Sequence, residues 1–141
     1  MSYKILVVDD SRSMRNVIKK MLRILGIEAG NILEAGNGVQ ALEVLEQEWV
    51  DLVLSDVHMP EMDGLELLRL LRKNEDLGDL PVVLITTETN EDHLAEAFSL
   101  GVKGYLRKPF QPEALQALLV QILGGSLDEQ QLAGSDEECD F

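Results

Sequence analysis

Cysteine and long apolar runs are both scarce in this sequence. Cys139 is the single cysteine among 141 residues, so an intrachain disulfide is impossible, which is usual in a reducing compartment. No apolar run approaches the ~20 residues that a membrane-spanning helix requires. The first residues also lack the apolar stretch and the cleavage site of a signal peptide. We therefore expect a cytoplasmic protein with no membrane partner.

Basic residues are outnumbered by acidic ones. The chain has 12 Lys and Arg against 26 Asp and Glu, which gives a net charge of −14. Non-specific nucleic-acid binding depends on Lys and Arg that neutralise phosphates, so this balance argues against a nucleic-acid partner. The segment 124–141 carries six acids and no base. We expect it to be an acidic, flexible C-terminal tail that follows a folded body spanning 1–123.

The body alternates short apolar runs with helical patterns. Runs that suit buried strands lie at 5–8, 31–35, 52–54, 82–85 and 105–107, and helices are expected at about 12–25, 39–46, 65–73, 90–100 and 112–123. Five strands that alternate with helices of this length predict an α/β protein, with a parallel sheet and helices on both of its faces. In such sheets the ligand site lies beyond the carboxyl ends of the strands.

Acidic residues follow two of the predicted strands. Asp9 and Asp10 follow the first strand, and Asp56 follows the third. Burial and mutual repulsion disfavour several close negative charges. A hard divalent cation would resolve the conflict, and Mg²⁺ prefers one or two carboxylates together with water. In the alternative interpretation, Asp9 and Asp10 only cap the helix that follows them, but a cap does not require the third acid.

Two further strand ends bear groups that suit phosphate chemistry. Thr86 offers a hydroxyl after the fourth strand, and Lys108 offers an ammonium group after the fifth. A cation, an ammonium group, a hydroxyl donor and a carboxylate nucleophile are the parts that phosphoryl transfer needs. The residues alone therefore point to an aspartyl-phosphate site, although a strand-end Thr or a loop Lys taken singly is weak evidence.

Five segments resemble the receiver domains of response regulators in two-component signalling. They occur in family order and at family-like spacings, and the match covers about residues 3–123. It is closest to stand-alone receivers of the chemotaxis type. The resemblance implies a flavodoxin-like, doubly wound sheet of five parallel strands in the order 2-1-3-4-5, flanked by five helices. The segments are 7–11, 54–56, 59–65, 85–86 and 104–110.

The resemblance assigns roles to the acids. Asp56 is implied to be the phosphoacceptor, which attacks the phosphoryl group carried by a histidine of a sensor kinase or phosphotransfer domain. Asp10 is implied to bind Mg²⁺ directly and Asp9 largely through water. Asp56 and the backbone carbonyl of His58 are implied to complete the metal's protein ligands.

The same resemblance describes a switch. Lys108 is expected to contact a phosphoryl oxygen, with a cis peptide bond to Pro109, and Thr86 to bond the phosphoryl group after transfer. Tyr105 is then expected to fill the space that Thr86 leaves. A phosphoryl group adds ~1.5 to 2 negative charges, enough to shift an equilibrium between two packings. The fourth helix, fifth strand and fifth helix would then present an altered surface to a downstream protein.

Two positions beside the site vary in the family and tune dephosphorylation. They are His58, two residues after the phosphoacceptor, and Glu88, two residues after Thr86. We predict that exchanging them changes the lifetime of the aspartyl phosphate. Ligation of the metal by the His58 ring is disfavoured, because Mg²⁺ prefers oxygen.

Two charged segments have alternative interpretations. The first helix bears a row of basic side chains, which form either a solvated face or a docking surface for an acidic phosphotransfer partner. The tail is either solvated or a tethered segment in which 126–132 rests on the fourth and fifth helices. That stretch faintly resembles the peptides of flagellar switch proteins, a possible downstream target. The basic residues are Arg12, Arg15, Lys19, Lys20 and Arg23.

We thus expect the protein to be a monomeric phosphoacceptor switch. It is not expected to be an enzyme beyond transferring a phosphoryl group to itself and removing it again. A phosphate sink or an intermediate in a phosphorelay is the alternative within the family. A small aspartyl phosphatase is disfavoured because Asp9 and Asp10 are adjacent and the chain is too short for a cap domain. A flavin-binding module would need a Ser/Thr-rich loop after the first strand. A degenerate receiver is disfavoured by the intact acid pair, Thr86 and Lys108.

Overall fold

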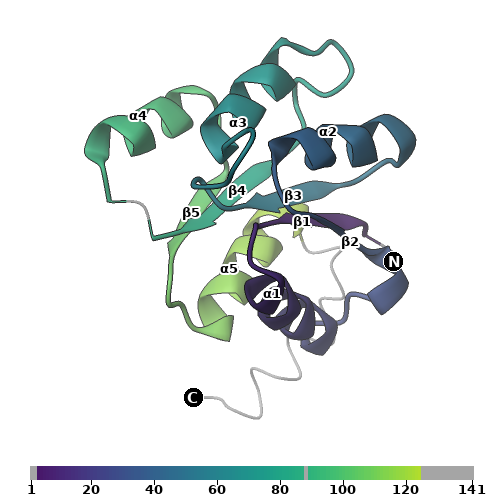
Figure 1. Cartoon of the computed structure of the whole chain (residues 1–141). Helices are drawn as coiled ribbons and strands as arrows, with labels where there is room; N and C mark the ends of the chain where they lie inside the picture. The colour runs from purple at the N-terminus through teal and green to yellow at the C-terminus, as the bar shows by residue number, and fades with distance from the viewer. Residues whose placement is uncertain (1–2, 88, 125–141) are drawn as a thin grey trace.

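The computed structural model describes residues 3–87 and 89–124. Its five-stranded parallel sheet has the order β2-β1-β3-β4-β5, which confirms the expected doubly wound topology. Helices cover both faces, with α2, α3 and α4 above the sheet and α1 and α5 below it in Figure 1. The strands are β1 (Ile5–Val8), β2 (Ile32–Ala35), β3 (Leu52–Ser55), β4 (Val82–Thr86) and β5 (Gly104–Arg107), and the helices are α1 (Arg12–Ile24), α2 (Gly38–Gln47), α3 (Gly64–Lys73), α4 (Glu91–Ser99) and α5 (Pro112–Leu123).

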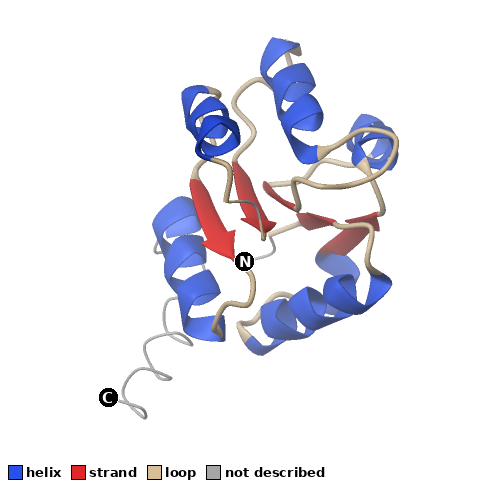
Figure 2. Cartoon of the chain, turned by 60° about the vertical axis from the view of Figure 1, so that its left-hand side comes forward, coloured by secondary structure: helices blue, strands red, loops and turns tan. Residues whose placement is uncertain are grey.

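Alternation along each strand divides the core into two layers. On β1, Leu6 and Val8 join the layer under α2, α3 and α4, whereas Ile5 and Val7 join the layer against α1 and α5. The central strands are therefore buried at every position and apolar except for Ser55 and Thr86 at their ends, as expected for strands covered on both faces. Figure 2 shows the sheet between its two layers of helices. Because the sheet is packed on both faces, it holds the residues that follow its strands in fixed positions.

The ends of the helices follow the expected chemistry. The Ser11 side chain caps α1 by accepting from the backbone N–H of Met14 at 3.2 Å. Asp63 and Glu66 form a reciprocal capping box at the start of α3. Gly26 ends the α1 region with a φ of 105°, which only glycine adopts without strain. Local sequence thus determines where these helices start and stop.

The structure refines several of the predicted boundaries. Most elements differ by a residue or two at an end, whereas β1 and α5 have the predicted bounds. A short 3-10 helix, Ala29–Asn31, precedes β2 and occupies the first residue of the predicted second strand. It was not predicted because three residues are too few to show a periodicity. Within the described ranges, no helix has both the length and the apolarity to cross a membrane.

Two predictions fall on residues outside the described ranges. These are the tuning role of Glu88 and nearly all of the tail, from residue 125 onward. The division into a body at 1–123 and a tail at 124–141 therefore stays a prediction.

Candidate functional site

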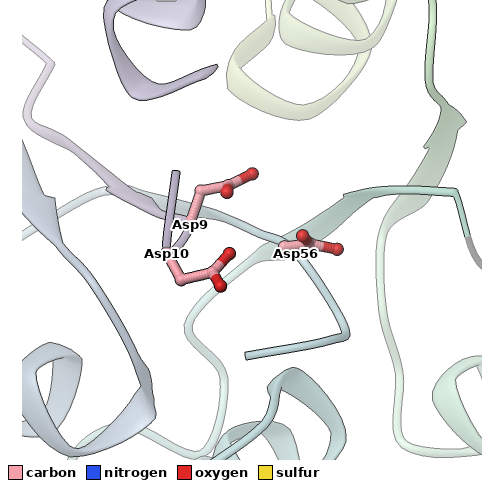
Figure 3. Close-up of side chains that lie close together, drawn as sticks. All are labelled: Asp9, Asp10 and Asp56. Carbon is pink, nitrogen blue, oxygen red and sulfur yellow. The ribbon is translucent and has the colours of Figure 1, made fainter. Parts of the chain in front are cut away.

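Three carboxylates meet at the carboxyl edge of the sheet. Asp9 and Asp10 follow β1, and Asp56 follows β3. The two strands are parallel neighbours with Val8 opposite Ser55, so the residues after them emerge side by side, as Figure 3 shows. One ligand oxygen from each carboxylate lies within 4.8 Å of the other two. The strand-end rule therefore correctly predicted that these acids come together.

The acids differ in their exposure. Asp9 is 1% exposed and Asp56 is 8% exposed, whereas Asp10 is open to solvent. A buried carboxylate needs compensating donors or charge. The Asp9 carboxylate accepts from the backbone N–H of Ser11 at 2.9 Å, and that of Asp56 accepts from Val57 at 2.6 Å. A longer contact joins the His58 N–H to Asp56 at 3.4 Å.

Among the described residues, Lys108 brings an ammonium group to these acids. Its Nζ lies 2.8 Å from Asp9 Oδ2 and 3.2 Å from Asp56 Oδ2. Burial by itself would lower the pKa of the Lys108 amine, but the hydrogen bond to Asp9 and the charge of Asp56 outweigh it. The net effect raises the pKa, so Lys108 is fully cationic at neutral pH.

The backbone holds Lys108 in this position. The Lys108–Pro109 peptide bond is cis, as expected, and the Lys108 N–H donates to the Thr86 carbonyl at 2.9 Å. The ends of β4 and β5 are thereby joined beside the acids.

The charge balance of the pocket suits a divalent cation. Three carboxylates and one ammonium group leave two negative charges in a largely buried cluster. The side-chain atoms that could bind a metal here are all carboxylate oxygens, and water can reach the pocket beside the exposed Asp10. A hard ion that keeps several waters and one or two carboxylates fits this donor set. The residues therefore fit Mg²⁺, with Asp9, Asp10 and Asp56 as the side chains that would hold it.

The other expected site residues flank the pocket. Thr86 ends β4 and is fully buried, and Tyr105 lies on β5 opposite Leu84, half-buried against the layer under α2, α3 and α4. His58 is exposed two residues after Asp56. Thr86 and Tyr105 therefore lie on neighbouring strands, as a coupled switch requires, although their roles remain a proposal.

Two residues that position the pocket were not predicted. Gly64 begins α3, and a Cβ there would overlap the carbonyl oxygen of Asp56, so only glycine allows this close approach. The Arg15 guanidinium donates to the carbonyl of Asp9 at 2.6 Å and to Glu34 at 2.9 Å. In the sequence Gly64 indicates only a loop, and Arg15 belongs to a basic helix face.

The chain matches the family model described as "Response regulator receiver domain" over residues 5–120. It is 41% identical over 122 residues to a "Chemotaxis protein CheY homolog" of Campylobacter jejuni, covering 86% of this chain and 92% of that protein. It is similarly 42% identical over 119 residues to "Chemotaxis protein CheY-3" of Vibrio cholerae, covering 84% of this chain and 90% of that protein.

Solved structures show the same similarity. Chemotaxis protein CheY4 of Vibrio cholerae has a TM-score of 0.78 and 34% identity, covering 86% of this chain and 99% of that one. The receiver domain of the sensor histidine kinase PA1611 from Pseudomonas aeruginosa has a TM-score of 0.76 and 29% identity, covering 86% of this chain and 98% of that one. That structure holds a magnesium ion coordinated in its active-site cleft.

Proposed function

The chain belongs to the family of response regulator receiver domains, of the chemotaxis-regulator type, and we propose that Asp56 is its phosphoacceptor. Receiver domains of this family are signalling switches that interact with histidine kinases and with downstream targets. In this proposal Asp56 takes a phosphoryl group from a histidine of a kinase or phosphotransfer domain. The protein then presents an altered surface to its target.

One observation carries the proposal. Lys108 Nζ bonds both Asp9 and Asp56 at the point where three carboxylates meet. Such a cluster is costly to bury. Its arrangement is explained if the pocket receives a divalent cation and an anionic phosphoryl group. A module that only binds another protein would gain nothing from burying these charges, which costs free energy.

Each residue would contribute to the transfer in a different way. A bound Mg²⁺ would supply positive charge to the phosphoryl oxygens, and Asp9, Asp10, Asp56 and the His58 carbonyl would hold it. A carboxylate oxygen of Asp56 would form the new bond to phosphorus, while the bond from phosphorus to the donor nitrogen breaks and its electron pair leaves with the histidine. Lys108 would stabilise charge on the transferred group, since positioning and positive charge dominate this chemistry.

The switch would begin with the charge that arrives. The phosphoryl group adds ~1.5 to 2 negative charges and three strong acceptors. The Thr86 hydroxyl and the Lys108 ammonium would satisfy them. Tyr105 would follow Thr86, and the surface of α4, β5 and α5 would change as a result. The transfer therefore shifts an equilibrium between two packings of one fold.

The basic side of α1 would serve encounter with the donor. Arg12, Lys20 and Arg23 are exposed there, whereas Arg15 and Lys19 pair with Glu34. Three exposed cations on an acidic protein would speed association with an acidic phosphotransfer domain. A flagellar switch protein is a candidate for the downstream target, because the chain is similar to chemotaxis proteins.

The proposal can be tested with a small phosphodonor. Incubation of the protein with acetyl phosphate and Mg²⁺ should add the mass of one phosphoryl group, located on Asp56 by peptide mapping. Asp56→Asn should abolish the adduct, and Asp76→Asn, an exposed acid at the other edge of the sheet, should leave it unchanged. Chelation of Mg²⁺ should prevent it. An unmodified wild-type protein, or an adduct elsewhere in the chain, would contradict the proposal.

A further inference from the structure

The opposite, amino edge of the sheet bears an exposed aromatic residue. Trp49, the only tryptophan of the chain, lies between α2 and β3 and is 70% exposed. Its indole N–H donates to Asp51 Oδ1 at 3.2 Å, and Asp51 Oδ2 accepts from the backbone N–H of Lys4 at 2.9 Å. The ring is therefore tethered in place while most of its surface faces solvent. A large aromatic side chain held in this way costs little entropy when it binds a partner.

Two hollows lie beside Trp49. Their volumes are about 170 Å³ and 230 Å³, and both are lined by Trp49, Val50, Asp76 and Leu77. Pockets for small-molecule ligands usually measure about 300–1,000 Å³, so these hollows are too small for a metabolite. They have the size that suits single side chains of a peptide. We call the two hollows and the ring the tryptophan groove.

Acids surround the apolar floor of the groove. Neither hollow is lined by any Lys, Arg or His. Lys4 is close, but it already pairs with Glu48 at 3.0 Å, and the Arg72 guanidinium donates to the carbonyls of Gly78 and Leu80. The lining acids are Glu46, Glu48, Asp51, Asp76 and Asp79.

We propose that the tryptophan groove binds a basic, partly apolar peptide segment of another protein. Lysine or arginine side chains of that segment would lie over the Trp49 ring and against the acids, and its apolar side chains would enter the hollows. Charge complementarity selects this occupant. The chain's own segment 125–141 carries six acids and no base, so the groove would repel it.

The groove is separated from the phosphoacceptor by the full length of β3. Asp51 and Asp56 flank that strand, five residues apart at roughly 3.3 Å per residue, or about 17 Å. No residue that lines the groove belongs to α4, β5 or α5, the surface that the switch would change. The groove would therefore bind its partner whether or not Asp56 is phosphorylated, and it would anchor this protein to that partner. The proposal does not depend on the proposed function.

A synthetic peptide in which lysine and leucine alternate serves as the probe. Titration into the full chain should change the fluorescence of Trp49, which reports from the groove without labelling. A fluorescein-labelled copy of the peptide allows variants to be compared by anisotropy. Trp49→Ala should weaken binding by at least about tenfold, as expected for a central aromatic contact. A peptide with glutamine in place of lysine should bind more weakly than the original.

A matched pair of triple variants separates the groove from net charge. Glu46→Gln, Asp76→Asn and Asp79→Asn together should weaken binding several-fold at low salt, whereas neutralising three exposed acids elsewhere should have less effect. The control set is Glu91→Gln, Asp92→Asn and Glu113→Gln. All six residues are exposed, so both proteins should fold.

Several results would overturn the proposal. Equal losses in the two triple variants would mean that net charge alone attracts the peptide. Binding that neither changes Trp49 fluorescence nor depends on Trp49 would place the peptide elsewhere. Self-association in the ultracentrifuge that Trp49→Ala abolishes would make a second copy the occupant. Beryllofluoride mimics the phosphoryl group on an aspartate. Loss of peptide binding in its presence would contradict the claim that the groove binds independently of the switch.

Discussion

The two ends of the sheet are both acidic, but they use negative charge in different ways. At the carboxyl edge, Asp9 and Asp56 are buried, converge with Asp10 within 4.8 Å, and share one ammonium group. At the amino edge, the acids are spread around an exposed indole. Convergent, desolvated charge favours a small hard cation. Dispersed, solvated charge favours an extended basic partner.

This difference shows that net charge alone does not identify a site. A net charge of −14 argues against non-specific nucleic-acid binding, but it does not distinguish one edge of the sheet from the other. What distinguishes them is the burial of each carboxylate and the donors that face it. If burial and facing donors set the role of each carboxylate, mutations at one edge should leave the other edge unaffected.

The largest expected effect is at the carboxyl edge. Lys108→Met removes the ammonium that bonds Asp9 and Asp56. We expect phosphorylation of Asp56 by acetyl phosphate to slow by about 10²–10³-fold, the usual cost of losing one donor to a transferring group. Lys103→Met, an exposed lysine just before β5, is the control and should react at the wild-type rate. A normal rate for Lys108→Met would remove Lys108 from the proposed chemistry.

The second effect concerns the packing behind Asp56. Gly64→Ala places a Cβ against the Asp56 carbonyl, and the backbone must shift to admit it. We expect a loss of about 1–3 kcal/mol in the free energy of unfolding by urea, as for other overpacked sites. Gly30→Ala is the control, because nothing lies within 4 Å of the Cβ it would add. Equal stability of the two variants would show that the loop accommodates the change.

Much of the fold could be predicted from the sequence, because the physical signals are local. Apolar runs marked the strands, helical spacing marked the helices, and Ser11 marked the start of α1. The strand order, by contrast, came from the family resemblance. Pattern alone does not say which parallel strands are neighbours, since every central strand is buried on both faces.

The candidate site was predicted in part for the same reason. Strand ends are local features, so Asp9, Asp56 and Lys108 could be grouped before the fold was known. The contact of Arg15 with the Asp9 carbonyl depends on how α1 lies on the sheet. The tryptophan groove joins Trp49 to Leu77, two loop residues that are far apart in sequence. Neither contact has a local signature.

A smaller effect separates positioning from charge at the carboxyl edge. Arg15→Met removes the donor to the Asp9 carbonyl. By Coulomb's law alone, losing a cation near the pocket would strengthen Mg²⁺ binding. We expect the opposite, about a tenfold weaker affinity by calorimetry, because outer contacts orient the ligands. Arg23→Met, an exposed residue of the same helix, should not weaken binding. Tighter Mg²⁺ binding by Arg15→Met would show that Arg15 acts only as a charge.

The smallest expected effect is seen by comparing Glu34, a paired acid within β2, with Asp76, an acid of the tryptophan groove. Lys19 and Arg15 bond Glu34, and the bond from Lys19 is the main cause of its lowered pKa. Because the folded pKa lies below the ordinary value, this stabilisation is present above about pH 4.5 and is lost as the pH falls through the folded pKa. Glu34→Gln should thus lower stability near pH 7 by at most about 1 kcal/mol, since the pairs are partly exposed, and the difference should vanish in acid.

Asp76→Asn, whose carboxylate no described cation bonds, should leave stability at pH 7 unchanged or slightly raised. If both variants lost equal stability at pH 7 in parallel urea titrations, the paired acid Glu34 and the groove acid Asp76 would not differ in the way their partners indicate.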